Sequence, residues 1–247
     1  MRKYKTDSSF TWICEKNGKK FVRKYKRKGL HAYPRTLSLK CILRCLSTSE
    51  ILYPRLLRNC IKYTDEEYID SSMDINSLDR KEILNTVIHY LIQMNKIENK
   101  VLSKYIKWNN NTEFLAFQIE NLKKVLIKRD SANIKEKIEE LNRLRKKLDD
   151  NRNLTFIHGD IHIRNMIANK KGLYLIDWEL ATYGDLAYEL ATLFILMNFS
   201  ETEKELFNKQ LSKIYSCNID FLQKDIEIYS NFEVLRRQYM KETKNRS

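Results

Sequence analysis

Side chains capable of acid–base chemistry and metal binding are concentrated between residues 158 and 177. A short apolar stretch runs into His158-Gly159-Asp160, and Asn165 follows on the same loop. Asp177 comes after two further apolar runs. Carboxylates at the ends of strands mark functional sites more often than ordinary surface, so this segment is the first candidate site.

The two apolar runs flank a polar turn at residues 169–172, which predicts a β-hairpin. Asn165 and Asp177 are equidistant from Lys171, so an unbulged hairpin places them across from each other at its open end. Cross-strand Cβ atoms lie ~5 Å apart, and Asp160 enters at the same end. Carboxylate and amide oxygens suit Mg²⁺, with substrate phosphates as further ligands. The alternative, an acidic hairpin on the surface, leaves the ordered spacing unexplained.

The same residues carry a resemblance to a known family. The pattern H-G-D-x-x-x-x-N, a hairpin, I-D-W-E and then G-D-x-x-x-E-L-A resembles the aminoglycoside phosphotransferase and choline kinase superfamily, most strongly over residues 154–194. The resemblance implies an α+β, protein-kinase-like fold of two lobes. We expect a small β-rich, nucleotide-binding lobe at residues 1–70 and a larger α-helical lobe with the catalytic loop and substrate site at residues 71–247.

The resemblance also implies an enzyme that moves the γ-phosphoryl group of ATP onto a hydroxyl of a small molecule, with Mg²⁺ as cofactor and GTP left open as the donor. Asp160 is similar to the family's catalytic base. Asn165 and Asp177 resemble its metal ligands, and His158 a structural residue that braces the catalytic loop.

The N-terminal lobe is expected to bind the nucleotide through a lysine on its third strand. Residues 21–25 resemble that strand, and Lys24 is our candidate for the phosphate-binding lysine. Arg23 points to the opposite face, so a register shift of one residue would exchange the two. The loop covering the phosphates would include Ser8 and Ser9, whose hydroxyls and amides can bind phosphate.

One expected element of the family is missing. The helix predicted at about residues 36–46 stands where the family has a helix with a glutamate partner for the lysine, yet it contains no acid. Glu50, just beyond the helix, is the nearest candidate. The missing glutamate keeps open an alternative of another class, a non-catalytic kinase-like protein that binds nucleotide.

The acceptor is expected to lie against the C-terminal helices. Asp225 and Glu233 could face a cationic acceptor there, although acids on a solvated helix face are the ordinary alternative. An aminoglycoside or an amino-alcohol is our expectation, with choline or thiamine as the alternative.

Composition sets limits on other functions. The net charge of +14 would suit a nucleic-acid binder, but the lysines are scattered and no nucleic-acid-binding motif accompanies them, so nucleic acid is not an expected partner. The five cysteines lack metal-site spacing. No signal peptide or membrane-length apolar run is present, so we expect a cytoplasmic protein without a membrane partner.

The remaining expectations concern the elements that position these residues. Alternation and an Asn17-Gly18 turn predict a hairpin over residues 10–25, and further strands are predicted at residues 51–57 and 67–69. Asp79 and Asn133 each precede a glutamate by three residues, which predicts two capped helices.

Overall fold

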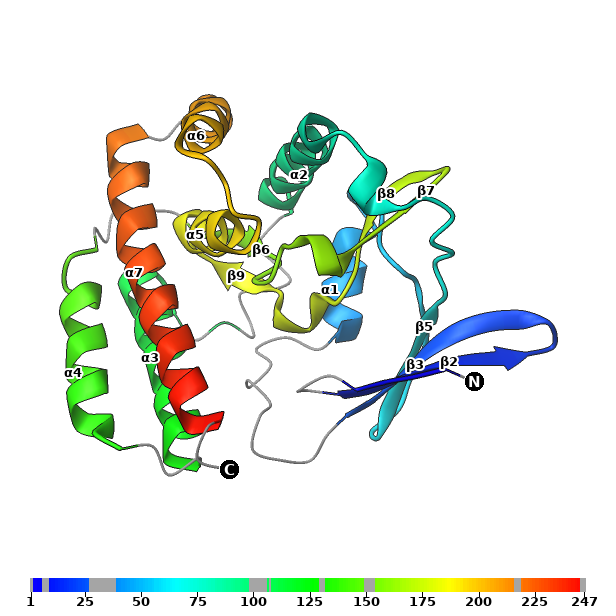
Figure 1. The fold of residues 1–247 in the computed structure, drawn as a ribbon, viewed down its shortest axis with the longest axis horizontal. Coiled ribbons are helices and arrows are strands. Elements are labelled where there is room, and N and C mark those ends of the chain that lie inside the picture. Colours follow the sequence, from blue (N-terminus) through cyan, green and yellow to red (C-terminus); the bar gives the residue numbers. More distant parts are fainter. Residues whose placement is uncertain are drawn as a thin grey trace.

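The computed structural model of the chain describes residues 2–5, 9–26, 39–97, 106, 108–128, 132–148, 154–215 and 219–244. An antiparallel sheet lies on one side of the molecule and a group of helices on the other (Figure 1). The sheet has the order β1-β2-β3-β5-β4. Its strands are β1 (Arg2–Lys5), β2 (Ser9–Lys16), β3 (Lys19–Lys26), β4 (Leu56–Asn59) and β5 (Tyr63–Glu67).

The predicted hairpin at the start of the sheet is confirmed. Asn17 and Gly18 join β2 to β3 with φ values of 52° and 71°. Asparagine and glycine tolerate this left-handed conformation, and two such residues match the twist of a hairpin.

The two other predicted strands were misplaced. Residues 51–55 are not in a strand, and β4 begins only at Leu56. The strand predicted at residues 67–69 is β5, which ends at Glu67 and contains two buried acids, Asp65 and Glu66. An acidic stretch resembles a loop in sequence, because the partners that neutralise it come from β3 and cannot be read from local pattern.

Helix α1 (Leu39–Leu46) comes between β3 and β4 in the chain. The helices that follow are α2 (Arg80–Asn95), α3 (Asn111–Lys128), α4 (Ile134–Arg145), α5 (Leu186–Leu196), α6 (Glu201–Tyr215) and α7 (Ile219–Lys244), with a 3-10 turn η1 (Ile75–Ser77) before α2. Asp79 caps α2 through a 2.9 Å bond from Lys81 N, as predicted. The cap predicted at Asn133 was wrong: its side chain makes no capping bond, because the residue is left-handed at φ 54°.

Two small two-stranded sheets lie between the large sheet and the helices. One pairs β6 (Thr155–Ile157) with β9 (Thr182–Gly184), and the other pairs β7 (Met166–Asn169) with β8 (Gly172–Leu175). The 3-10 turns η3 (Ile163–Asn165) and η4 (Trp178–Leu180) connect them. Helix α5 packs against β6 and is buried from Leu186 to Phe194, so it supports the loops that follow the small sheets.

The expected α+β, protein-kinase-like arrangement is confirmed. The lobe boundary that we placed at residue 70 falls between the end of β5 and the start of η1. Over the ranges given above, the helices are too short or too polar to cross a membrane.

Candidate functional site

His158 follows β6 and is fully buried. Its Nδ1 accepts the N–H of Asp160 at 3.2 Å, so Nε2 carries the proton and donates to Ile176 O at 3.0 Å. The edge of the ring meets Trp178 at a centroid distance of 4.5 Å. Burial lowers the pKa of His158 to about 4 despite the nearby Asp160. A neutral histidine with both nitrogens engaged is suited to bracing the loop and not to proton transfer.

Asp160 lies on the loop between β6 and β7. Asn165 Nδ2 donates to both the backbone oxygen and Oδ2 of Asp160, each at 2.9 Å. His162 Nε2 approaches Oδ2 at 3.4 Å, while its Nδ1 accepts the N–H of Arg164. Burial alone would raise the pKa of Asp160, but His162, His158 and Asn165 together outweigh burial and hold it below its usual range. Asp160 is therefore held as an ionised carboxylate.

Glu189 on α5 contacts the backbone of the loop between β6 and β7. Its Oε2 accepts the N–H of Gly159 at 2.7 Å, and burial raises the pKa of Glu189 to about 8. Gly159 has φ 81°, and a Cβ there would meet Leu180 O at 3.0 Å. The position thus requires glycine for its backbone angle and for space.

The β7–β8 hairpin brings Asp177 to the loop, in a register one residue different from our prediction. Met166 pairs with Leu175, so Asn165 lies opposite Ile176 and Asp177 is one residue further along. The turn consists of Lys170 and Lys171, so the hairpin is centred between these two residues and not on Lys171. Asn165 and Asp177 still both lie at the open end of the hairpin.

The backbone of Ile176 joins the end of the hairpin to the loop that carries His158 and Asp160. Its N–H donates to Asn165 O at 2.9 Å, and its C=O accepts from His158. Asp177 itself is left-handed at φ 64°, a conformation that costs energy for a residue with a Cβ. Its side chain is 38% exposed, so the carboxylate is accessible to solvent.

The oxygen atoms gathered here suit a hard cation that shares its coordination with phosphate. Because Asn165 uses Nδ2 to bind Asp160, its Oδ1 is the atom left for a ligand role. The structure, over the residues described, contains no group of three His, Cys, Asp or Glu side chains that could hold a metal alone. When phosphates supply further ligands, one carboxylate and one amide oxygen can serve as the protein ligands of Mg²⁺.

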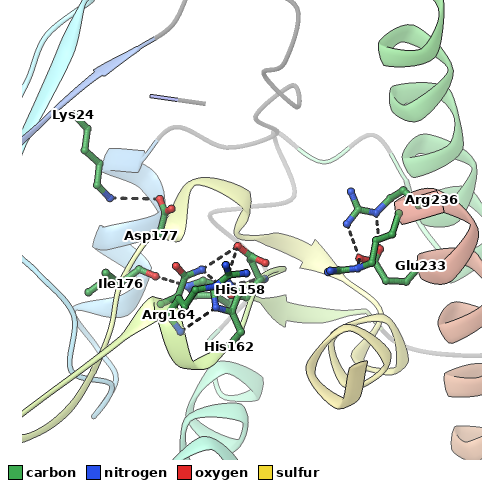
Figure 2. A network of polar contacts seen from close by, with 11 residues as sticks. Lys24, His158, His162, Arg164, Ile176, Asp177, Glu233 and Arg236 are labelled. Carbon is green, nitrogen blue, oxygen red and sulfur yellow. Dashed lines mark hydrogen bonds and ion pairs between the residues drawn. The ribbon is translucent and has the colours of Figure 1, made fainter. Parts of the chain in front are cut away.

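Lys24 reaches Asp177 from the sheet, and Figure 2 shows the two side chains directed toward each other. Lys24 Nζ lies 3.4 Å from Asp177 Oδ1 and 3.1 Å from Glu66 Oε2. Burial works against the ammonium, but Asp177, Glu66 and Glu179 outweigh it and raise the pKa of Lys24. Arg23 lies on the other face, bound to Asp65 at 2.6 and 2.8 Å, so the structure places Lys24 and not Arg23 at the site.

The other residues expected to serve the nucleotide are placed differently. Glu50 was the wrong candidate for a partner of Lys24, because its Oε2 binds His89 and Gln93, each at 3.1 Å. Ser8 lies outside the described residues, and Ser9 is the first residue of β2.

A cavity adjoins Asp160 on the side away from Lys24. Its walls come from α3, α5, α7 and the η4 segment. Phe117 and Tyr188 supply aromatic surface, and the charged lining consists of Asp160, Glu179, Glu233, Arg236 and Arg237. Three carboxylates and two guanidinium groups leave one net negative charge on this lining.

Glu233 is fully buried on α7 and neutralised by two neighbours on the same helix. Arg236 Nε and Arg237 Nε lie 2.5 and 2.6 Å from its oxygens. Figure 2 shows Arg236 and Glu233 on α7, apart from the group around His158. Asp225, our other candidate for acceptor contact, is also fully buried but is not among the residues lining this cavity.

Sequence reasoning missed several residues of the site. Glu189 stands in the G-D-x-x-x-E-L-A segment that we had noted without assigning it a role. His162 stands two residues after Asp160, where a polar contact is foreseeable. Glu66 gave no local signal, because its partner comes from β3. Arg236 follows Glu233 by three residues on α7, a spacing at which helix side chains pair, so this contact could have been read from the sequence.

The sequence profile of the phosphotransferase enzyme family matches residues 5–223. The thiamine kinase of Escherichia coli K12 is 37% identical over 68 residues, which are 27% of this chain and 24% of that enzyme. The chain thus matches about a quarter of the length of this curated relative.

Solved structures resemble the whole fold. The gentamicin complex of APH(2″)-IIa has a TM-score of 0.66 at 19% identity and covers 98% of this chain and 85% of that one. The choline kinase LicA from Streptococcus pneumoniae has a TM-score of 0.65 at 20% identity, covering 97% and 90%. These structures confirm the fold, and together with the family match they confirm the superfamily that the motif indicated.

Proposed function

Because the chain belongs to the phosphotransferase enzyme family, we propose that it transfers the γ-phosphoryl group of ATP to a hydroxyl of a small molecule, with Mg²⁺ bound by Asn165 and Asp177. The observation that carries this proposal is that Asn165 holds an ionised Asp160 on the loop before the β7–β8 hairpin, while Asp177, at the end of that hairpin, contacts the Lys24 ammonium from the sheet. Phosphoryl transfer requires mainly positioning and charge neutralisation, which these groups supply.

In the proposed reaction, the acceptor hydroxyl gives its proton to Asp160 while its oxygen forms a bond to the γ-phosphorus. The bond from the γ-phosphorus to the β–γ bridging oxygen breaks, and ADP leaves with that electron pair. Lys24 binds phosphate oxygens, and Asn165 holds Asp160 in place by its two hydrogen bonds. Mg²⁺, when bound, neutralises negative charge on the phosphates.

We further propose a cationic acceptor, an amino-alcohol or an aminoglycoside, bound in the cavity beside Asp160. The net negative lining and the aromatic side chains of Phe117 and Tyr188 favour a cation. The choline kinase and gentamicin-binding relatives act on or bind molecules of this kind by their names, and choline or thiamine is the specific alternative.

A non-catalytic nucleotide-binding protein is the second candidate, favoured only by the lack of an acid in α1. The two are separated by experiment. A thermal shift with ATP and Mg²⁺, with GTP in parallel, tests binding, and a mass-spectrometric screen of amino-alcohols, aminoglycosides and neutral sugars tests transfer. A phosphorylated amine-containing product supports the proposal. Binding without any product supports the second candidate. The absence of both binding and product would refute both candidates.

A further inference from the structure

The family places the acidic partner of its phosphate-binding lysine on the helix after the third strand, and this chain has none there. From Lys16 to Ser49 the sequence contains no aspartate or glutamate. The absence therefore holds for the whole connection between β3 and α1. Helix α1 turns its apolar side chains inward, burying Leu39, Ile42, Leu43, Cys45 and Leu46.

A carboxylate from elsewhere fills this role. Glu66 on β5 lies with Oε2 3.1 Å from Lys24 Nζ, and its side chain is only 9% exposed. The strand register explains the contact: Lys24 pairs with Thr64 and Val22 pairs with Glu66. Lys24 and Glu66 are thus diagonal neighbours on one face of the sheet, within reach of long side chains.

The second contact of Lys24 cannot serve as its permanent anchor. Asp177 is 38% exposed and, under the proposed function, is needed for the metal. If Asp177 served as a metal ligand, Glu66 would remain as the carboxylate that holds the ammonium. The neighbouring pair Arg23–Asp65 crosses the same two strands on the opposite face and provides a matched structural reference.

We propose that Glu66 is the positioning residue for Lys24, replacing the helix glutamate of the family with a carboxylate from the sheet itself. The inference rests on the proposed function, because it concerns the lysine that binds ATP. Since β3 and β5 are hydrogen-bonded strands of one sheet, the lysine is held in place by strand register and does not depend on where α1 sits.

A double-mutant cycle tests this inference. ATP affinity would be measured by titration calorimetry with Mg²⁺ for wild type, Glu66→Gln, Lys24→Met and the double variant. Loss of one charge-assisted hydrogen bond predicts that Glu66→Gln weakens ATP binding ~tenfold. If Glu66 acts through Lys24, the same substitution in the Lys24→Met background changes affinity less than ~twofold.

Asp65→Asn is the control, because it breaks a buried ion pair on the other face. It is expected to lower the melting temperature while leaving ATP affinity unchanged. Should Glu66→Gln fail to fold, Glu66→Asp takes its place in the cycle, since it keeps the charge and withdraws it by one methylene. For that variant we expect ~threefold weaker binding with Lys24 present and no effect without it.

The outcomes separate the inference from the function. The role of Glu66 would be overturned if Glu66→Gln weakened ATP binding equally with and without Lys24, or by no more than Asp65→Asn does. Either result would leave the proposed function standing. Lack of ATP binding by the wild type would overturn both.

Discussion

The substitution Glu189→Gln tests, without an activity assay, whether a protonated Glu189 supports the loop at Gly159. In the folded chain the pKa of Glu189 is raised from 4.5 to about 8 by burial, and its oxygen accepts the N–H of Gly159. Glutamine has the same shape as a protonated glutamate and keeps an acceptor for Gly159. The substitution should therefore preserve the loop and remove only the titration.

The sign of the pH effect follows from proton binding. Between pH 4.5 and 8 the folded chain keeps a proton on Glu189 that the unfolded chain has lost, so stability falls as pH rises, by about 1.4 kcal/mol per pH unit. His158 acts oppositely: its pKa is lowered from 6.5 to about 4, so its contribution to stability is lost as pH falls through that window. The two slopes roughly cancel below pH 6.5.

Above pH 6.5 only the Glu189 slope is left of these two, amounting to about 2 kcal/mol up to pH 8. Urea unfolding at several pH values between 6.5 and 8 measures it directly. We expect the wild type to lose stability across this range and Glu189→Gln to be nearly flat. A flat wild-type profile, or equal slopes in the two proteins, would refute the protonated state of Glu189.

Three further predictions concern the rest of the site. Asp177→Ala should abolish the Mg²⁺-dependent part of ATP binding and Asn165→Ala should weaken it less, since an amide offers only a dipole; calorimetry that finds the same ATP affinity for wild type and the Asp177 variant, both with and without Mg²⁺, would contradict this. Gly159→Ala should destabilise the protein by roughly 1–3 kcal/mol in urea unfolding, because φ 81° and Leu180 O at 3.0 Å both oppose a Cβ; an unchanged unfolding midpoint would argue against the strain. Glu233→Gln should raise KM for a cationic acceptor more than it lowers kcat, because it leaves two guanidinium groups without their counterion beside the cavity; steady-state kinetics in which KM stays constant would exclude Glu233 from acceptor binding.

The geometry of the segment from Asp160 to Asp177 was predictable because its contacts join residues that lie close together in the sequence. Asp160 and Asn165 are on one loop, and a single hairpin returns the chain to Asp177. The register was wrong by one residue, since equal spacing about Lys171 does not reveal that the turn has two residues. The same local rules predicted the Asn17-Gly18 turn and the Asp79 cap.

The rest could not be predicted because it depends on contacts between distant elements. Glu66 stands in an acidic stretch that resembles a loop, and only the pairing of β3 with β5 makes it a partner of Lys24. By contrast, Glu233, predicted as an acid facing the acceptor, pairs with Arg236 and Arg237 at i+3 and i+4 of the same helix, a spacing that the sequence shows. Asp225 shares that helix and is buried away from the cavity lining.

Transfer of label from γ-phosphate-labelled ATP to an amine-containing acceptor, in wild type and Asp160→Asn side by side, tests the central claim most directly. Asparagine keeps the size of the side chain but cannot accept the hydroxyl proton. We predict labelled product from the wild type, unchanged ATP affinity in the variant, and a kcat lower by at least ~10². Equal rates of product formation in the two proteins would contradict the assignment of Asp160 as the base and with it the proposed reaction.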